Sequence, residues 1–97
     1  MEDSTANLKL YPNPFTDHLK IEMAIPSGLD CEKAFVRFFS QTGQLVFEKQ
    51  VSVTPGVPLE VEWKGINFEG SRVPAGTYFV MVQAGAGTWS KSVIKSE

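Results

Sequence analysis

The side chains that most often perform acid–base or nucleophilic chemistry are scarce in this chain. It has one histidine, His18, and one cysteine, Cys31. A nucleophilic cysteine needs a positioned base, and general acid–base catalysis needs a histidine or a tuned carboxylate beside its partner. His18 directly follows Asp17, and adjacent residues of a strand point to opposite faces. We therefore expect His18 to be an exposed turn residue and Cys31 to be a small buried apolar residue.

The carboxylates are dispersed along the chain. Glu60 and Glu62 share one strand face, but their alternation with apolar residues indicates a solvated outer face rather than a paired-carboxylate site. Asn67 and Glu69 supply too few oxygen ligands for calcium, and no Cys/His cluster could bind zinc. The sequence thus predicts no catalytic residue, no metal site and no cofactor, and we expect that the protein is not an enzyme.

The two tryptophans are the most informative aromatic residues. Trp63 lies on the apolar face of its segment, which indicates a core position. Trp89 follows a glycine-rich turn and is expected to be partly exposed. An exposed aromatic ring can stack on a sugar, so a carbohydrate-binding or adhesive module is an alternative function at this point.

Length and composition exclude several classes of protein. The chain has 97 residues, enough for one domain, with 42% hydrophobic and 21% charged residues, as in ordinary globular proteins. The net charge is −2 and the basic residues are scattered, so we expect no nucleic-acid partner. The first residues contain no basic segment followed by an apolar one, unlike a signal peptide. No apolar run is long enough to span a membrane, so no direct membrane insertion is expected.

Alternation of apolar and polar residues with a period of two dominates the chain and predicts strands. The segments expected to form strands are 8–11, 18–25, 34–40, 45–53, 59–64, 77–83 and 88–94. Turn residues separate them, and no connection is long enough for a parallel crossover. The sequence therefore predicts an all-β protein, an immunoglobulin-like β-sandwich of about seven antiparallel strands.

Some positions allow finer expectations. The segment 34–40 carries large apolar residues on both faces and should be a central strand. Gly43 should supply a positive φ in the turn 41–44. Tyr78, with an apolar body and a polar tip, is expected to be a corner residue bonded to backbone. One face of the segment 45–53 should carry Leu45, Phe47, Val51 and Val53, interrupted by Lys49.

Four motifs follow one another along the chain. They read LYPNPF at 10–15, SQTGQLV at 40–46, VPAGTYF at 73–79 and KSVIK at 91–95. In this order they resemble the type A C-terminal sorting domain of the type IX secretion system (the Por secretion system) of Bacteroidota, over essentially all of residues 8–95. The stretch 62–70 also resembles the immunoglobulin-like domain of flagellar hook-capping proteins, so a structural spacer is a further alternative.

The resemblance implies a C-terminal sorting signal of a larger exported protein. It implies residues 1–7 as a linker or the start of an expressed fragment, residues 8–97 as the sorting domain, and a cargo domain linked upstream. The partner would be the outer-membrane secretion machinery, and the protein would reach the cell surface or medium through the periplasm and outer membrane. A weak homodimer through an edge strand is also expected. The signal residues that the resemblance suggests are Pro12, Asn13, Pro14, Gly43, Gly76, Tyr78, Lys91, Val93, Ile94 and Lys95.

Lys91 and Lys95 allow two interpretations. A partner could read them directly, or they could protect an exposed edge strand against aggregation.

Overall fold

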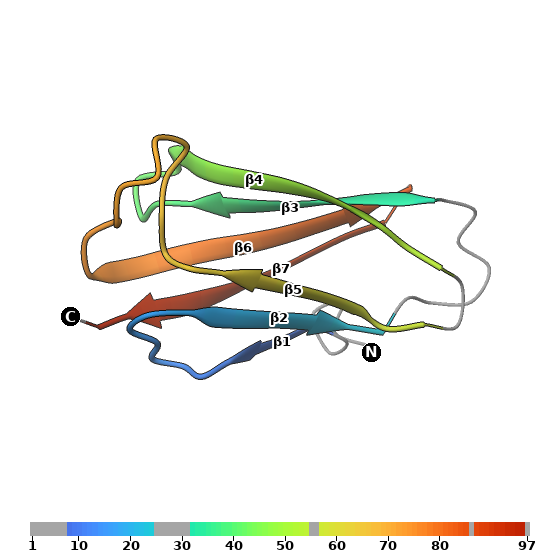
Figure 1. The fold of residues 1–97 in the computed structure, drawn as a ribbon, viewed down its shortest axis with the longest axis horizontal. Coiled ribbons are helices and arrows are strands. Elements are labelled where there is room, and N and C mark those ends of the chain that lie inside the picture. The colour runs from blue at the N-terminus through green and yellow to red at the C-terminus, as the bar shows by residue number, and fades with distance from the viewer. Residues whose placement is uncertain (1–7, 25–31, 55–56, 86, 97) are drawn as a thin grey trace.

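The structure, a computed structural model, describes residues 8–24, 32–54, 57–85 and 87–96. These residues form seven β-strands in two sheets (Figure 1). The strands are β1 (Leu8–Tyr11), β2 (Leu19–Met23), β3 (Lys33–Phe39), β4 (Leu45–Ser52), β5 (Leu59–Trp63), β6 (Gly76–Ala84) and β7 (Gly87–Lys95). One sheet has the order β1-β2-β5 and the other β4-β3-β6-β7. No helix of the described residues is long and apolar enough to cross a membrane.

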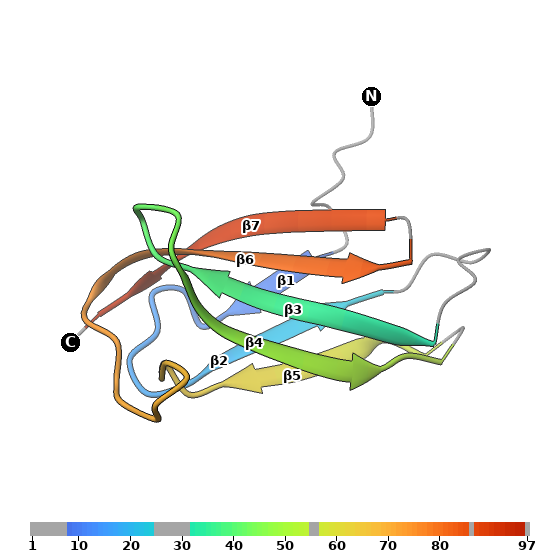
Figure 2. The same ribbon diagram turned by 90° about the horizontal axis from the view of Figure 1, so that it is seen from above.

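The predicted all-β, immunoglobulin-like sandwich is confirmed. Every strand pair is antiparallel, and each of the segments expected from the alternation overlaps one observed strand. The strand β3 lies between β4 and β6, in the central position that its two apolar faces predict. Cys31 and Ile25 lie outside the described residues. The two sheets pack face to face, as the view from above shows (Figure 2).

The core forms between the sheets from alternate residues of the strands. Trp63 is buried, as predicted, and stacks on Phe38 of the opposite sheet with 4.3 Å between ring centroids. Phe15 and Tyr78 pack against the same indole, each with its ring centroid 5.7 Å away. The indole Nε1 donates a hydrogen bond to the carbonyl of Ile66 at 2.9 Å, which satisfies its one polar group.

The prediction for β4 was wrong at Leu45. Phe38 pairs with Phe47, but Phe39 pairs with Leu45, so Val46 is an extra residue, a β-bulge. Because of the bulge, Leu45 lies on the outer face with Phe39 and is 37% exposed, whereas Val46 packs against the core. Alternation within one strand could not show this shift, since it depends on pairing with β3.

The outer face of the three-stranded sheet is charged. Glu60 lies opposite Glu22, and Glu62 lies opposite Lys20; Lys9 is the other neighbour of Glu22. Glu60 and Glu62 are both exposed, in agreement with the solvated outer face expected for them.

Tyr78 is the corner residue that the sequence predicts. Its side chain is buried in the sandwich, and its hydroxyl donates a hydrogen bond to the carbonyl of Pro74 just before β6. Burial raises the pKa of the Tyr78 phenol above its usual value, because ionisation is unfavourable away from water. The bond fixes the direction in which the chain enters β6.

Replacement of Tyr78 with phenylalanine should lower the free energy of unfolding by about 1 kcal/mol, the usual value of one such hydrogen bond. Tyr11→Phe is the matched control, because the hydroxyl of exposed Tyr11 bonds only to the Glu22 carboxylate, at 3.3 Å. That control should change the free energy by less than about 0.5 kcal/mol. Urea unfolding followed by circular dichroism measures both variants. Equal losses in the two variants would contradict the assignment of Tyr78 as the corner residue.

Candidate functional site

The sequence motifs gather at one end of the sandwich, which we call the motif end. It holds the connection from β1 to β2, the turn 41–44, the connection from β5 to β6 and the last residues of β7 (Figure 1, at the left). Leu8 begins β1 at the other end of the three-stranded sheet, where it pairs with Met23, the partner of Leu59.

Residues 12–15, which we call the strap, lie along the outer edge of β7. The amide of Ile94 donates a hydrogen bond to Oδ1 of Asn13 at 3.1 Å. The amide of Phe15 donates to the carbonyl of Ile94 at 2.9 Å, and the amide of Ser96 donates to the carbonyl of Phe15 at 2.7 Å. These bonds join the first motif to the last across about four-fifths of the sequence.

A buried side chain anchors the strap. The ring of Phe15 is 1% exposed and packs on Trp63 in the core. Gly65 lies beside it with a φ of +71°, in the left-handed region where glycine is favoured. A Cβ atom at Gly65 would stand 3.1 Å from Cε of Lys95 and 3.5 Å from Cε2 of Phe15. The strap, the loop after β5 and the end of β7 thus share one tightly packed contact.

Several predicted signal residues lie inside the domain. Val93 and Tyr78 are opposite each other in the β6–β7 ladder and both are buried. Lys95 is opposite Gly76 and is only 4% exposed, because its aliphatic stem packs along Gly65. Long cationic side chains often bury their stems in this way. The side chains of Tyr78, Val93 and Lys95 are therefore part of the packing of the motif end.

Lys91 is exposed and has a different role from Lys95. Its ammonium donates a hydrogen bond to the carbonyl of Leu8 in β1 at 3.2 Å. Lys91 has the same parity along β7 as buried Val93, so its side chain leaves the strand on the inner side. It connects the edge strands of the two sheets.

The exposed members of the predicted set are Pro12, Asn13, Pro14, Gly43, Lys91 and Ile94. The strap and Ile94 are adjacent through the bonds described above. Gly43 has the predicted positive φ, +91°, but its turn joins β3 to β4, two strands away from β7. The structure therefore brings the strap and Ile94 together and leaves Gly43 apart.

An apolar row on the outer face of the four-stranded sheet was not foreseen. Phe79 lies opposite Phe39, and Phe39 lies opposite Leu45. Ile94 stands one diagonal position from Phe79, because it pairs with Thr77. Phe79, Leu45 and Ile94 are exposed. The apolar residues on the second face of the segments 34–40 and 77–83 could have indicated such a row. Only the strand register, however, shows that they lie side by side.

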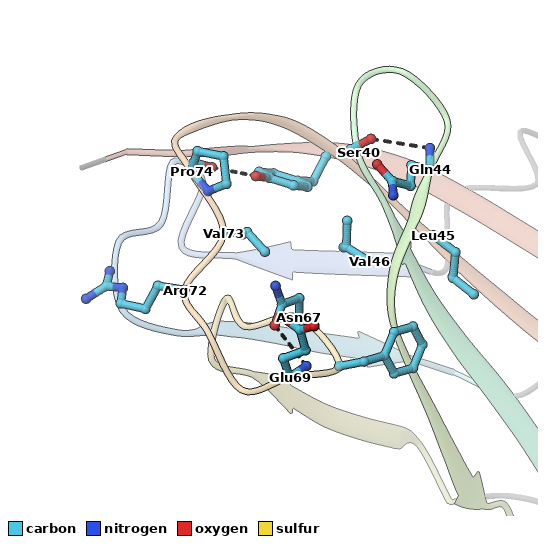
Figure 3. Close-up of a pocket in the computed structure, with 11 residues that line it drawn as sticks. Ser40, Gln44, Leu45, Val46, Asn67, Glu69, Arg72, Val73 and Pro74 are labelled. Atoms are coloured by element: carbon cyan, nitrogen blue, oxygen red, sulfur yellow. Dashed lines mark hydrogen bonds between the residues drawn. The ribbon is translucent and has the colours of Figure 1, made fainter.

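A groove of about 430 Å³ opens at the motif end between the start of β4 and the loop before β6 (Figure 3). Val46 and Val73 contribute its apolar surface. Part of its polar rim is bonded within the chain: Oδ1 of Asn67 accepts hydrogen bonds from the amides of Glu69 and Ser71, at 2.9 and 3.0 Å.

The residues that could have performed chemistry do not converge. Within the described ranges, no group of three or more His, Cys, Asp or Glu residues could hold a metal ion. His18 is exposed, as expected, and Asp17 lies 3.6 Å from the guanidinium of Arg72 in an exposed ion pair. Trp89 is half-buried; its ring fills the space over Gly87 and packs against the core.

Comparison with known proteins agrees with the motif geometry. The profile of the secretion system C-terminal sorting domain matches residues 9–96. The chain belongs to this family. The resemblance seen in the sequence is thereby confirmed, and the domain is a C-terminal sorting signal for type IX secretion. No curated protein matches the chain.

Two solved structures share the fold of this sorting domain. Dimeric latent PorU from Porphyromonas gingivalis is 22% identical with a TM-score of 0.73, and the match covers 91% of this chain and 9% of that one. PorZ, described as an essential surface component of the type IX secretion system of the same organism, is 23% identical with a TM-score of 0.64, covering 96% and 12%. This chain thus spans only a small part of the length of either protein.

The packing at Gly65 can be tested against Gly43. Both glycines have a positive φ, so alanine at either position should cost about 1–2 kcal/mol of stability through backbone strain. A Cβ at Gly43 would meet open space, whereas one at Gly65 would crowd Cε of Lys95 and lie in van der Waals contact with Phe15. Gly65→Ala should therefore lose about 1 kcal/mol more than Gly43→Ala in urea unfolding followed by tryptophan fluorescence. Equal losses would refute a tight contact among the strap, the loop and β7.

Proposed function

We propose that the secretion machinery recognises this sorting domain at the motif end, through the exposed strap and the exposed side chain of Ile94. The observation that carries the proposal is the set of hydrogen bonds that joins Asn13 and Phe15 to Ile94 and Ser96. These bonds place the first and last motifs of the domain in one surface. A receptor that binds this surface would distinguish the domain from other β-sandwiches.

The position of the chain entry supports the same surface. Within the three-stranded sheet, Leu8 begins β1 at the end opposite Tyr11, which the strap follows, so a cargo linked upstream would attach on the side of β1 away from the strap. We infer that such a cargo reaches the periplasm by its own export signal and then crosses the outer membrane to the surface or the medium. The domain itself acts by being recognised and not by catalysis.

The edge of β7 offers a way of binding. Ile94 directs its amide and carbonyl away from β6, so the residues of the same parity, Thr88, Ser90 and Ser92, direct theirs outward too. The strand β7 is the last in its sheet, and no described strand pairs with this stretch. We propose that an extended segment of the machinery adds to this edge by main-chain hydrogen bonds. The same edge would serve a weak homodimer.

A charge on Ile94 should block sorting without unfolding the domain. Ile94 is 50% exposed, and Val57, an aliphatic residue at the end where Leu8 lies, is 54% exposed. A fluorescent cargo fused ahead of the whole chain carries either Ile94→Lys or Val57→Lys in a host with type IX secretion. Export of the Ile94→Lys fusion should fall by at least about tenfold, the effect of one lost central contact. The Val57→Lys fusion should be exported normally. Normal export of both fusions would refute recognition at the motif end.

Removal of one outward amide should test edge addition. Proline at Ser90 deletes an amide that points away from β6, and proline is tolerated on edge strands where the amide faces solvent. Ser90→Pro should reduce export of the fused cargo while the domain keeps its circular dichroism spectrum. Ser90→Ala, which keeps the amide, should be exported like the wild type. Full export of a folded Ser90→Pro domain would argue against edge addition.

A further inference from the structure

Ile94 obtains its backbone hydrogen bonds from the strap. It stands opposite Thr77 in the ladder, but its amide donates to Asn13 and its carbonyl accepts from the Phe15 amide, so neither group bonds to β6. The next amide, that of Ser96, also donates to the strap, at the carbonyl of Phe15. The extended conformation of residues 94–96 therefore depends on a segment about eighty positions earlier in the chain.

Without the strap, this part of β7 would have little to hold it. It is the end of an edge strand, and the β6–β7 register stops at the pair Gly76–Lys95. Strand ends that are bonded on one side only tend to fray. In contrast, the pairs from Tyr78–Val93 to Gln83–Thr88 lie within the ladder.

The anchor of the strap is held by residues of both sheets. The exposed residues of the strap contribute little burial, and its anchor is the ring of Phe15 between Trp63 and the Gly65–Lys95 contact. Trp63 in turn stacks on Phe38 of the opposite sheet. Contacts of such long sequence separation carry a loop-closure cost that the packing of the folded sandwich offsets.

We propose that Asn13 and Phe15 are positioning residues of the sorting signal, which hold residues 94–96 in the extended form that the machinery reads. The signal is then discontinuous, and its C-terminal part is complete only in a domain whose first and last motifs have met. Sorting would in this way select folded domains. The inference rests on the proposed recognition at the motif end.

Asn13 gives a test with a matched control. Asn13→Ala removes the oxygen that accepts from the Ile94 amide, whereas Asn13→Asp keeps an acceptor at the same place. The side chain of residue 13 is exposed, so neither substitution should disturb the core. Each variant is made in the whole chain with a fluorescent cargo fused ahead of it. Exchange of the Ile94 and Val80 amides is followed by NMR, and export is measured in a host with type IX secretion.

In Asn13→Ala the Ile94 amide should exchange about tenfold faster, the effect of one lost hydrogen bond near the upper end of its usual range. The Val80 amide, in the centre of the ladder, should exchange as in the wild type, and export of the cargo should fall. Asn13→Asp should keep both the protection of Ile94 and the export.

Three results would overturn the inference. One is normal export of Asn13→Ala although Ile94 exchanges faster, and another is an Ile94 amide that remains protected in that variant. The third is equal acceleration at Val80 and Ile94, which would mean that Asn13 acts only through global stability. Failure of the inference is distinguishable from failure of the proposed function: if Ile94→Lys blocks export while Asn13→Ala does not, recognition at the motif end stands and only the role of the strap is refuted.

Discussion

The indole of Trp63 is the contact on which the rest of the structure depends. It packs against Phe38 of the other sheet, Tyr78 of β6 and Phe15 of the strap. Its Nε1 donates a hydrogen bond to a carbonyl of the loop between β5 and β6. Aromatic pairs with such centroid separations contribute beyond their buried area. One residue thus joins both sheets, the strap and the loop before β6. The bonds at the end of β7 follow from this packing, because they require Phe15 to be fixed.

The motifs that identify the family serve mainly to build this end of the sandwich. In the first motif, Phe15 is the buried anchor and Asn13 is the exposed acceptor. In the third, Tyr78 is the corner residue, and in the last, Val93 and Lys95 are buried. A motif residue is therefore not in itself an exposed residue. Burial separates the positions that shape the surface from those, such as Ile94, that are accessible on it.

The sequence allowed the strands to be predicted well, because period-two alternation reports directly on which side of a strand faces a core. The bulge in β4 was not predicted, because Leu45 faces outward as a result of its pairing with Phe39, which the sequence around Leu45 does not reveal. The bridge between Phe15 and Lys95 was not predicted either, because local sequence patterns do not indicate a contact between residues so far apart in the chain. For the same reason the burial of Lys95 could not be foreseen: it depends on the bare backbone at Gly65, far away in sequence.

The position of Lys91 is relevant to how the open edge of β7 could bind one partner and not pair with other strands. A charged side chain on the inner side of an edge strand discourages pairing with arbitrary strands, because a close partner would bury the charge. Lys91 occupies that side of β7 and bonds to β1, whereas Thr88, Ser90 and Ser92 face outward with short uncharged side chains. A segment of a partner could still bond to the outward amides and carbonyls of β7, provided that it does not displace the Lys91 ammonium from the carbonyl of Leu8. The position of Lys91 agrees with protection of the edge, one of the two interpretations of the lysines, while the buried stem of Lys95 belongs to the packing that holds the strap.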